Sequence, residues 1–318
     1  MQSDPNKRQM DLFEHMDLQA QKDSPDYKQQ LLAILSKTDD FRILERVPVT
    51  KKSIVFPYHL SDPVGDEKTI IFLDTETTGF SLDVEKIIEL AMVSVSFSPS
   101  KKRLVSINHL FDEYEDPGKA IPAEIVQLAG ISDEQVKGKI INDAEVSAYL
   151  KQAALVVAHN ASFDRPFCEK RFKDIDTIKW ACSLKGVDWS LFDISNHRQE
   201  ELLHTIGYFY EAHRASIDCL ALIWFMHIRQ DIFANLLDNA NKIGVIVHAF
   251  GAPFDAKDQL KSNGYRWNDG SFGMPKHWWK EVSDETLPQE KAFLDNLTAY
   301  SAKQASFEKV SAQERFKK

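Results

Sequence analysis

Hydrophobic residues are spread unevenly along the chain, and their spacing predicts its elements. They are sparse up to about residue 67 and dense from residue 68 onward, where apolar runs alternate with short polar turns. Apolar runs of this kind, bounded by turns, are typical of buried strands. The pattern predicts three strands joined as an antiparallel meander, over residues 70–74, 87–97 and 103–111.

From residue 122 the spacing becomes mainly helical, with two short apolar runs between the helices. Those runs predict strands at residues 155–158 and 178–183, and Ser162 is the predicted N-cap of a helix that ends at Phe172. The other predicted helices cover residues 122–128, 143–151, 199–206 and 215–229. Three strands followed by alternating helices and strands predict an α/β fold, a mixed sheet flanked by helices.

The two ends of the chain differ from this central part. The N-terminal end is polar, with helical stretches near residues 10–20 and 27–36, and such segments bury too little apolar surface to fold alone. The C-terminal end mixes short strands and helices. The predicted parts are a polar N-terminal extension at 1–67, the mixed-sheet domain at 68–231, a small α+β module at 232–283 and a polar helical tail at 284–318.

Composition narrows the class of protein. With 43% hydrophobic and 27% charged residues the chain is ordinary for a globular protein, and no apolar run approaches the ~20 residues of a membrane span. Cys168, Cys182 and Cys219 are isolated in sequence, which favours a reducing, cytoplasmic location. The net charge of −9 argues against broad coating of nucleic acid, although a nuclease needs acids at its metal site and only local basic contacts.

Two acidic residues, Asp74 and Glu76, lie at the end of the first predicted strand. Residues two apart on a strand point to the same face, so both carboxylates would project into one small volume. Like charges that close are unfavourable unless a cation lies between them, and oxygen ligands suit Mg²⁺ or Mn²⁺. The alternative is a pair of ordinary surface acids at a strand end.

Further chemical groups follow in the second half of the chain. Asp164 is predicted in the first turn of a helix, where a carboxylate also acts as a simple cap. His213 and Asp218 would lie roughly 140° apart on one helix, so a shared site requires His213 in the loop before it. A loop histidine can serve as a general base near neutral pH, and the alternative is an ordinary polar loop residue.

Three motifs in this order resemble those of DEDD-type 3′–5′ exonucleases of the histidine subclass, at residues 74–79, 159–164 and 213–218. The resemblance is to the branch of the epsilon proofreading subunit of bacterial DNA polymerase III. It includes residues 122–131, which are similar to that family's segment before the second motif, and it covers about residues 68–230. A ribonuclease H-like fold is therefore implied.

The resemblance also implies a role for each chemical residue. Asp74, Glu76, Asp164 and Asp218 would hold two Mg²⁺ or Mn²⁺ ions, and His213 would take a proton from the attacking water.

Substrate contacts are implied as well. Thr77 and Thr78 would contact the terminal 3′-hydroxyl through backbone groups, while Phe80 and Ile131 would pack on the last base. Phe80 departs from the family, whose members often carry leucine there, but it still supplies an apolar wedge.

The implied activity is release of nucleoside 5′-monophosphates from single-stranded or frayed DNA 3′ ends, in replication proofreading or repair. An RNA-trimming relative stays open, because the residues that check the 2′-hydroxyl cannot be located from sequence. A non-catalytic nucleic-acid or clamp adaptor is a second alternative. A glycosidase also uses paired carboxylates, but it would explain neither His213 nor the other two acids.

Both ends carry a motif with two interpretations. Residues Gln9-Met-Asp-Leu-Phe13 resemble clamp-binding peptides, in which Leu12 and Phe13 would occupy an apolar pocket of the partner. The resemblance implies a sliding clamp or a replicative polymerase as partner. An amphipathic helix explains the same residues equally well. Aromatic and basic residues alternate at 257–267 and 276–280, which fits either a grip on single strands or the core of a small domain.

Overall fold

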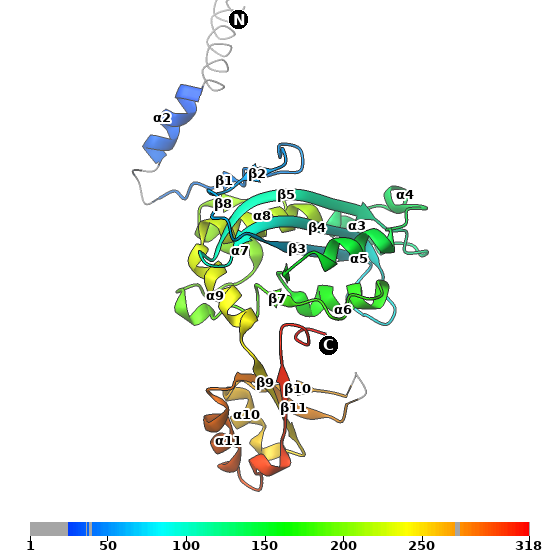
Figure 1. The fold of residues 1–318 in the computed structure, drawn as a ribbon, viewed down its shortest axis with the longest axis vertical. Helices are drawn as coiled ribbons and strands as arrows, with labels where there is room; N and C mark the ends of the chain where they lie inside the picture. Colours follow the sequence, from blue (N-terminus) through cyan, green and yellow to red (C-terminus); the bar gives the residue numbers. More distant parts are fainter. Residues whose placement is uncertain (1–24, 36, 38–39, 271–273, 318) are drawn as a thin grey trace, which may run out of the picture.

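A six-stranded mixed sheet forms the centre of the larger domain, residues 45–241 (Figure 1). The computed structural model describes residues 25–35, 37, 40–270 and 274–317. The strand order is β2-β5-β4-β3-β6-β7, with β3, β4 and β5 antiparallel and β6 and β7 parallel to β3. The strands are β2 (Tyr58–His59), β3 (Lys68–Thr77), β4 (Ile87–Ser98), β5 (Arg103–Tyr114), β6 (Leu155–Ala158) and β7 (Trp180–Cys182). The predicted meander and mixed sheet are confirmed.

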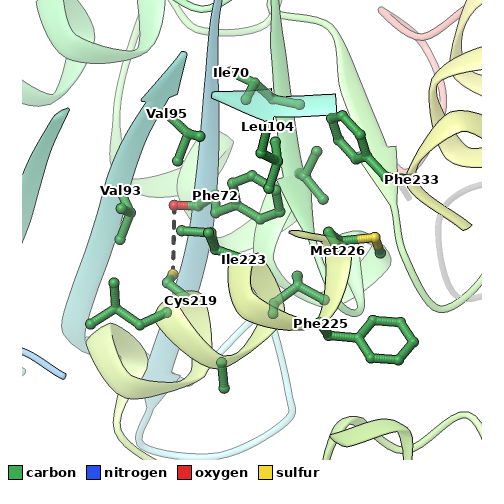
Figure 2. Close-up of a cluster of buried hydrophobic side chains, with 14 of the residues drawn as sticks. Ile70, Phe72, Val93, Val95, Leu104, Cys219, Ile223, Phe225, Met226 and Phe233 are labelled. Atoms are coloured by element: carbon green, nitrogen blue, oxygen red, sulfur yellow. Dashed lines mark hydrogen bonds between the residues drawn. The ribbon is translucent and has the colours of Figure 1, made fainter. Parts of the chain in front are cut away.

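Helices cover both faces of this sheet. Strand alternation sends Ile70 and Phe72 toward α8 and α9, where they join the cluster drawn in Figure 2. The intervening Ile71 and Leu73 pack on the opposite face, against α5 and α6. The helices are α3 (Ala123–Ala129), α4 (Asp133–Val136), α5 (Asp143–Lys151), α6 (Ala161–Arg171), α7 (Gln199–Thr205), α8 (Ala215–Ile228) and α9 (Gln230–Asn241). Each strand of the centre is therefore buried on both sides.

Two local predictions differ from the structure. Helix α6 already begins at Ala161, so its N-cap is Asn160 and not Ser162. Residues 45–61 also belong to the larger domain and not to a polar extension, because Val47 and Val49 are buried in its core. Here β1 (Glu45–Arg46) pairs with β8 (Tyr208–Phe209), and β2 pairs with β5.

Helix α2 (Pro25–Leu35) corresponds to the helix predicted at 27–36. The helix predicted near 10–20 lies outside the described residues, as do Gln9, Leu12 and Phe13.

A second, four-stranded antiparallel sheet forms the C-terminal module, residues 244–310 (Figure 1). Its strand order is β10-β11-β9-β12, and helices α10 (Lys257–Ser262) and α11 (Leu287–Asp295) pack against it around a separate apolar core. The strands are β9 (Gly244–Phe250), β10 (Arg266–Asn268), β11 (His277–Ser283) and β12 (Ser306–Val310).

The predicted boundaries of this module were wrong at both ends. Helix α9 was assigned to it, but Phe233 and Leu236 are buried in the core of the larger domain. The predicted tail at 284–318 contains β12, which pairs with β9 over five residues and completes the sheet. The module therefore begins after α9 and includes most of the supposed tail.

The chain returns to the larger domain after β12. The Trp180 amide donates to the Ala312 carbonyl at 2.8 Å. The buried Arg165 guanidinium donates to the carbonyls of Gln313 at 2.6 Å and Arg315 at 2.7 Å. The module is thus fixed to the larger domain at its start and at its end. No helix among the described residues combines the length and apolar character needed to span a lipid bilayer.

Candidate active site

Three carboxylates meet where β3 passes the first turn of α8. Asp74 and Glu76 continue the alternation of Ile70 and Phe72, so they face α8, which carries Asp218 in its first turn. One oxygen from each of Asp74, Glu76 and Asp218 lies within 4.8 Å of the other two. Carboxylate oxygens at this spacing fit a hard divalent cation such as Mg²⁺ or Mn²⁺.

Asp164 approaches this cluster from the other side of the strand. Thr75 points toward α6, and its backbone amide and hydroxyl donate to Asp164 Oδ1 at 3.1 and 2.9 Å. Asp164 is buried and lies outside the set of three oxygens within 4.8 Å. Its negative charge is nevertheless close enough to raise the pKa of Asp74. The structure therefore places the four predicted acids together, three in direct proximity and Asp164 beside them.

Burial and mutual repulsion make these four groups resist ionisation. Desolvation, followed by the charges of Asp164 and Asp218, raises the pKa of Asp74 well above its usual value. Desolvation is also the main cause that raises the pKa of Glu76 to about 8, of Asp164 to about 7 and of Asp218 to about 6. A bound cation would offset both causes, which is the behaviour expected of metal ligands.

These shifts predict how stability depends on pH in the metal-free protein. Folding raises the pKa of each of these acids. The stability that an acid of this kind contributes is fully present at pH values below its pKa in the unfolded chain, near 4. That stability is lost as the pH rises through its pKa in the folded protein. We expect the melting temperature in EDTA to fall by roughly 5–10 °C between pH 5 and pH 8.5. Calorimetry at constant ionic strength measures this.

The same reasoning predicts how metal ions change the melting temperature. Mg²⁺ or Mn²⁺ must displace protons at low pH, so either ion should raise the melting temperature more at pH 8 than at pH 5.5. A metal-free melting temperature that climbs from pH 5 to 8, or a metal effect independent of pH, would contradict this assignment of the carboxylates.

His213 lies in the loop directly before α8, as the spacing required. Its side chain is exposed, and its backbone has φ 69°, in the left-handed region that residues other than glycine seldom adopt. Such strained positions concentrate at functional sites. The imidazole is therefore free to move beside the carboxylates while its backbone is held.

An ion pair that sequence reasoning missed holds this loop. Glu89 on β4 is completely buried at 0% exposure and accepts from Arg214 Nη2 at 2.8 Å and Nε at 3.2 Å. Its other oxygen accepts the Ala215 amide at 3.0 Å, so it also caps α8. A lone acid inside the apolar run 87–93 was the available signal. Glu89 and Arg214 are thus positioning residues for His213.

Hydrogen bonds also fix the orientation of Asp218. Tyr210 Oη donates to Asp218 Oδ1 at 2.9 Å, and the Arg214 amide donates to Oδ2 at 3.0 Å. Gln199 Nε2 donates to Tyr210 Oη at 3.0 Å and to the Asp218 carbonyl at 2.9 Å. Neither Tyr210 nor Gln199 belongs to a motif, so sequence alone gave no reason to select them.

The predicted substrate contacts differ in accessibility. Phe80 is 83% exposed and packs edge-on against Phe163, so it can meet a base. Ile131 is 0% exposed inside a cluster with Ile88 and Val136, and the predicted base contact is therefore wrong for this structure.

The two threonines are buried, and part of their hydrogen-bonding capacity is used within the turn. The Thr78 amide donates to the Lys86 carbonyl at 2.8 Å, and the Thr77 hydroxyl donates to the Gly79 carbonyl at 2.7 Å. Contact with a terminal 3′-hydroxyl would therefore involve other atoms of these residues.

His159, the first residue of the second motif, is buried and has a hydrogen-bonding partner at each ring nitrogen. His159 contacts Ser183 Oγ and the His197 carbonyl, both at 2.9 Å, and burial lowers the pKa of His159 to about 4. The neutral imidazole of His159 therefore links the end of β6 to the segment after β7 and to the loop that contains His197. Because both of its nitrogens are engaged, His159 is not a candidate general base.

Comparison with known proteins agrees with the motifs. Residues 71–224 match the exonuclease family model RNase_T. The chain is 36% identical over 126 residues to the PolC-type DNA polymerase III of Latilactobacillus sakei, covering 38% of this chain and 8% of that protein. It is 27% identical over 210 residues to that of Streptococcus suis, covering 61% and 14%. The chain thus spans only a small part of these relatives.

Solved structures of lower similarity were also found. Exonuclease X in complex with 5′ overhanging duplex DNA is 23% identical, with a TM-score of 0.38 over 52% of this chain and 98% of that one. The nuclease domain of 3′hExo, a DEDDh family member bound to rAMP, is 17% identical, with a TM-score of 0.44 over 55% and 97%. Residues 71–224 are thus similar to an exonuclease family model and to part of PolC-type DNA polymerase III, in agreement with the exonuclease resemblance of the motifs.

Proposed function

We propose that the chain is a metal-dependent 3′–5′ exonuclease that removes nucleoside 5′-monophosphates from DNA 3′ ends in replication proofreading or repair. The observation that carries the proposal is the convergence of Asp74, Glu76 and Asp218 within 4.8 Å, with an exposed histidine in the adjoining loop. Three acids that can bind metal ions and an imidazole that can accept a proton are suited to metal-dependent phosphodiester hydrolysis.

Asp74, Glu76 and Asp218 would hold the ions, with Asp164 beside them. When bound, two Mg²⁺ or Mn²⁺ ions supply positive charge at the scissile phosphate and lower the pKa of the attacking water. His213 accepts the proton of that water from its loop. The ion pair of Glu89 with Arg214 keeps the loop in place, and Tyr210 keeps Asp218 directed at the site.

The exposed ring of Phe80 would stack on the terminal base of the strand. Aromatic stacking tolerates any base, as an exonuclease acting on mixed sequence requires. The three cysteines are buried and unpaired, which suits the cytoplasmic location included in this proposal.

Digestion of end-labelled oligonucleotides tests polarity and metal dependence together. With Mg²⁺ or Mn²⁺, a 3′ label should leave at once as a mononucleotide, whereas a 5′-labelled strand should shorten step by step. EDTA should stop both reactions. Early release of the 5′ label, or digestion in EDTA, would contradict the proposal.

Two alternatives are resolved by the same assay. Faster digestion of a matched RNA strand would indicate RNA trimming. A metal-loaded protein that binds strands but releases no nucleotide would indicate a non-catalytic adaptor. A partnership with a sliding clamp or replicative polymerase through Gln9–Phe13 stays a prediction.

A further inference from the structure

A cleft of about 700 Å³ separates the larger domain from the C-terminal module. Its walls come from β7 and α9 on one side and from β9, β10 and β11 on the other, which Figure 1 shows facing each other. Its volume lies within the range of ligand sites, about 300–1,000 Å³.

Three cations in this cleft have no acidic partner. Among the described residues, Lys185, Lys242 and Arg266 form no ion pair, although the chain as a whole is acidic at −9. The other two basic residues of the lining are neutralised: Lys280 pairs with Glu290 at 2.6 Å, and Arg315 pairs with Glu281 at 2.6 Å. The lining also contains Asp188 and Glu314, which form no ion pair in the described part of the chain. Its unpaired groups are therefore three basic and two acidic residues, and the balance is a small positive charge.

Two of these cations, Lys185 and Arg266, line the cleft from different domains. Burial lowers the pKa of the Lys185 ammonium, and the nearby charge of Arg266 lowers it further. Lys185 Nζ donates to Ser162 Oγ at 2.8 Å and contacts no carboxylate. An anion between them would relieve the repulsion of the two cations.

The module also presents an aromatic surface to the cleft. Arg266 and Trp279 are paired across β10 and β11, and the guanidinium lies over the indole ring at 5.7 Å from its centroid. Trp267 and Trp278 occupy the next register position and so point to the opposite face. Trp279 therefore lines the cleft beside Arg266, whereas Trp267 does not.

The cleft adjoins the catalytic carboxylates through α6. Ser162 lines the cleft, and Asp164, two residues later on α6, belongs to the acidic site. The two side chains lie about 200° apart around the helix axis, so they point to different sides of its first turn. Phe163 between them contacts the exposed Phe80. A strand whose end lies at the carboxylates would therefore pass around the first turn of α6 to reach Ser162 and the cleft.

We propose that this interdomain cleft binds the single-stranded nucleic acid upstream of the cleaved end, with Lys185 and Arg266 on its phosphates and Trp279 stacked on a base. The inference rests on the proposed exonuclease function and adds the C-terminal module as its substrate-holding part. Basic side chains bind the phosphates of a single strand and an aromatic side chain stacks on its bases, and both contacts tolerate any sequence.

Fluorescence anisotropy in EDTA measures binding without cleavage. The probe is a 5′-fluorescein DNA strand of about 20 nucleotides, with an RNA strand of the same sequence as the second arm. We expect Lys185→Ala/Arg266→Ala to raise Kd about 10-fold or more and to reduce the salt slope by about 1.4. Trp279→Ala should raise Kd about 5- to 100-fold.

Matched controls separate the cleft from general effects. Lys151→Ala/Lys173→Ala removes the same charge from exposed positions outside the cleft, and Trp267→Ala removes an indole, 51% exposed, from the opposite face. Lys185→Arg should retain binding. Truncating the chain after α9 would be a poor test, because it also removes the carbonyls of residues 313 and 315 that bind Arg165 in the larger domain.

Hydrolysis with Mn²⁺ then distinguishes the two proposals. The cleft variants should raise KM for the long strand about 10-fold and leave kcat/KM for a dinucleotide unchanged. Wild-type binding by both cleft variants, or equal losses on strand and dinucleotide, would overturn the inference and leave the nuclease intact. Cleft-dependent binding without any nucleotide release would overturn the proposed function alone.

Discussion

The Asp74→Asn variant is expected to lose at least ~1,000-fold in kcat/KM and to gain stability when metal is absent. Asp74 clusters with Glu76 and Asp218, with Asp164 nearby, so its amide analogue keeps the shape and removes the charge that a cation needs. Losing several kcal/mol of charge stabilisation corresponds to three or more powers of ten in rate. Initial rates on a labelled strand measure the loss.

The gain in stability follows from the raised pKa of Asp74. Folding holds this carboxyl where ionisation is unfavourable, so a neutral amide relieves the folded state at pH 8 but changes little at pH 4. Calorimetry in EDTA should show a melting temperature higher by a few degrees at pH 8.

Asp116 provides the matched control. Its oxygens accept the amides of Gly118 at 2.8 Å and Gly138 at 2.7 Å, and these bonds lower the pKa of Asp116. Asp116→Asn should therefore gain no stability at pH 8 and keep wild-type activity. An Asp74→Asn enzyme within tenfold of wild type, or one that melts earlier than wild type in EDTA at pH 8, would contradict the assignment.

The fold was predictable where local pattern and packing agree. The runs that became β3, β4 and the first half of β5 are mostly buried, so their apolar sequence identified them. Their ends were not predictable: the first strand was predicted to stop at Asp74, yet it continues to Thr77 because Glu76 and Thr77 pair with β4. Cross-strand pairing, which sequence spacing does not show, sets such limits.

The same reason explains the errors at the C-terminal end. Residues 306–310 have too few apolar positions to indicate a strand, and they form β12 because β9 offers a free edge. Helix α9 precedes the module in sequence but buries Phe233 against Phe97 of the larger domain. Composition gave no information on which domain or strand each of these segments packs against.

In the candidate site, the ordered motifs identified the acids and His213, whereas their supports depend on distant contacts. Glu89 and Arg214 are separated by 125 positions, and Thr75 and Asp164 by 89. Chemistry concentrated in short motifs can be read from sequence. The residues that orient it are specified by the fold.

Replacing His213 is expected to lower kcat about 100- to 10,000-fold while metal binding persists, the range for loss of a general base. His213 lies in the loop before α8, outside the three-carboxylate cluster, so its removal leaves the cation ligands in place. At saturating Mn²⁺ the carboxylates stay ionised, and the rise of kcat/KM between pH 5.5 and 7.5 should then flatten in the variant. Rate profiles against pH and metal titrations measure the two effects.

The backbone of His213 determines which substitution isolates the chemistry. At φ 69° alanine is strained, whereas asparagine tolerates this region and supplies no base, so His213→Asn tests the imidazole with the loop preserved. His213→Gly should be equally inactive yet melt later than His213→Ala, because glycine relieves the strain. If His213→Asn kept the wild-type pH profile, proton transfer would have to be assigned elsewhere. If it instead lost Mn²⁺ affinity, the histidine would be acting on the cation site and not on the attacking water.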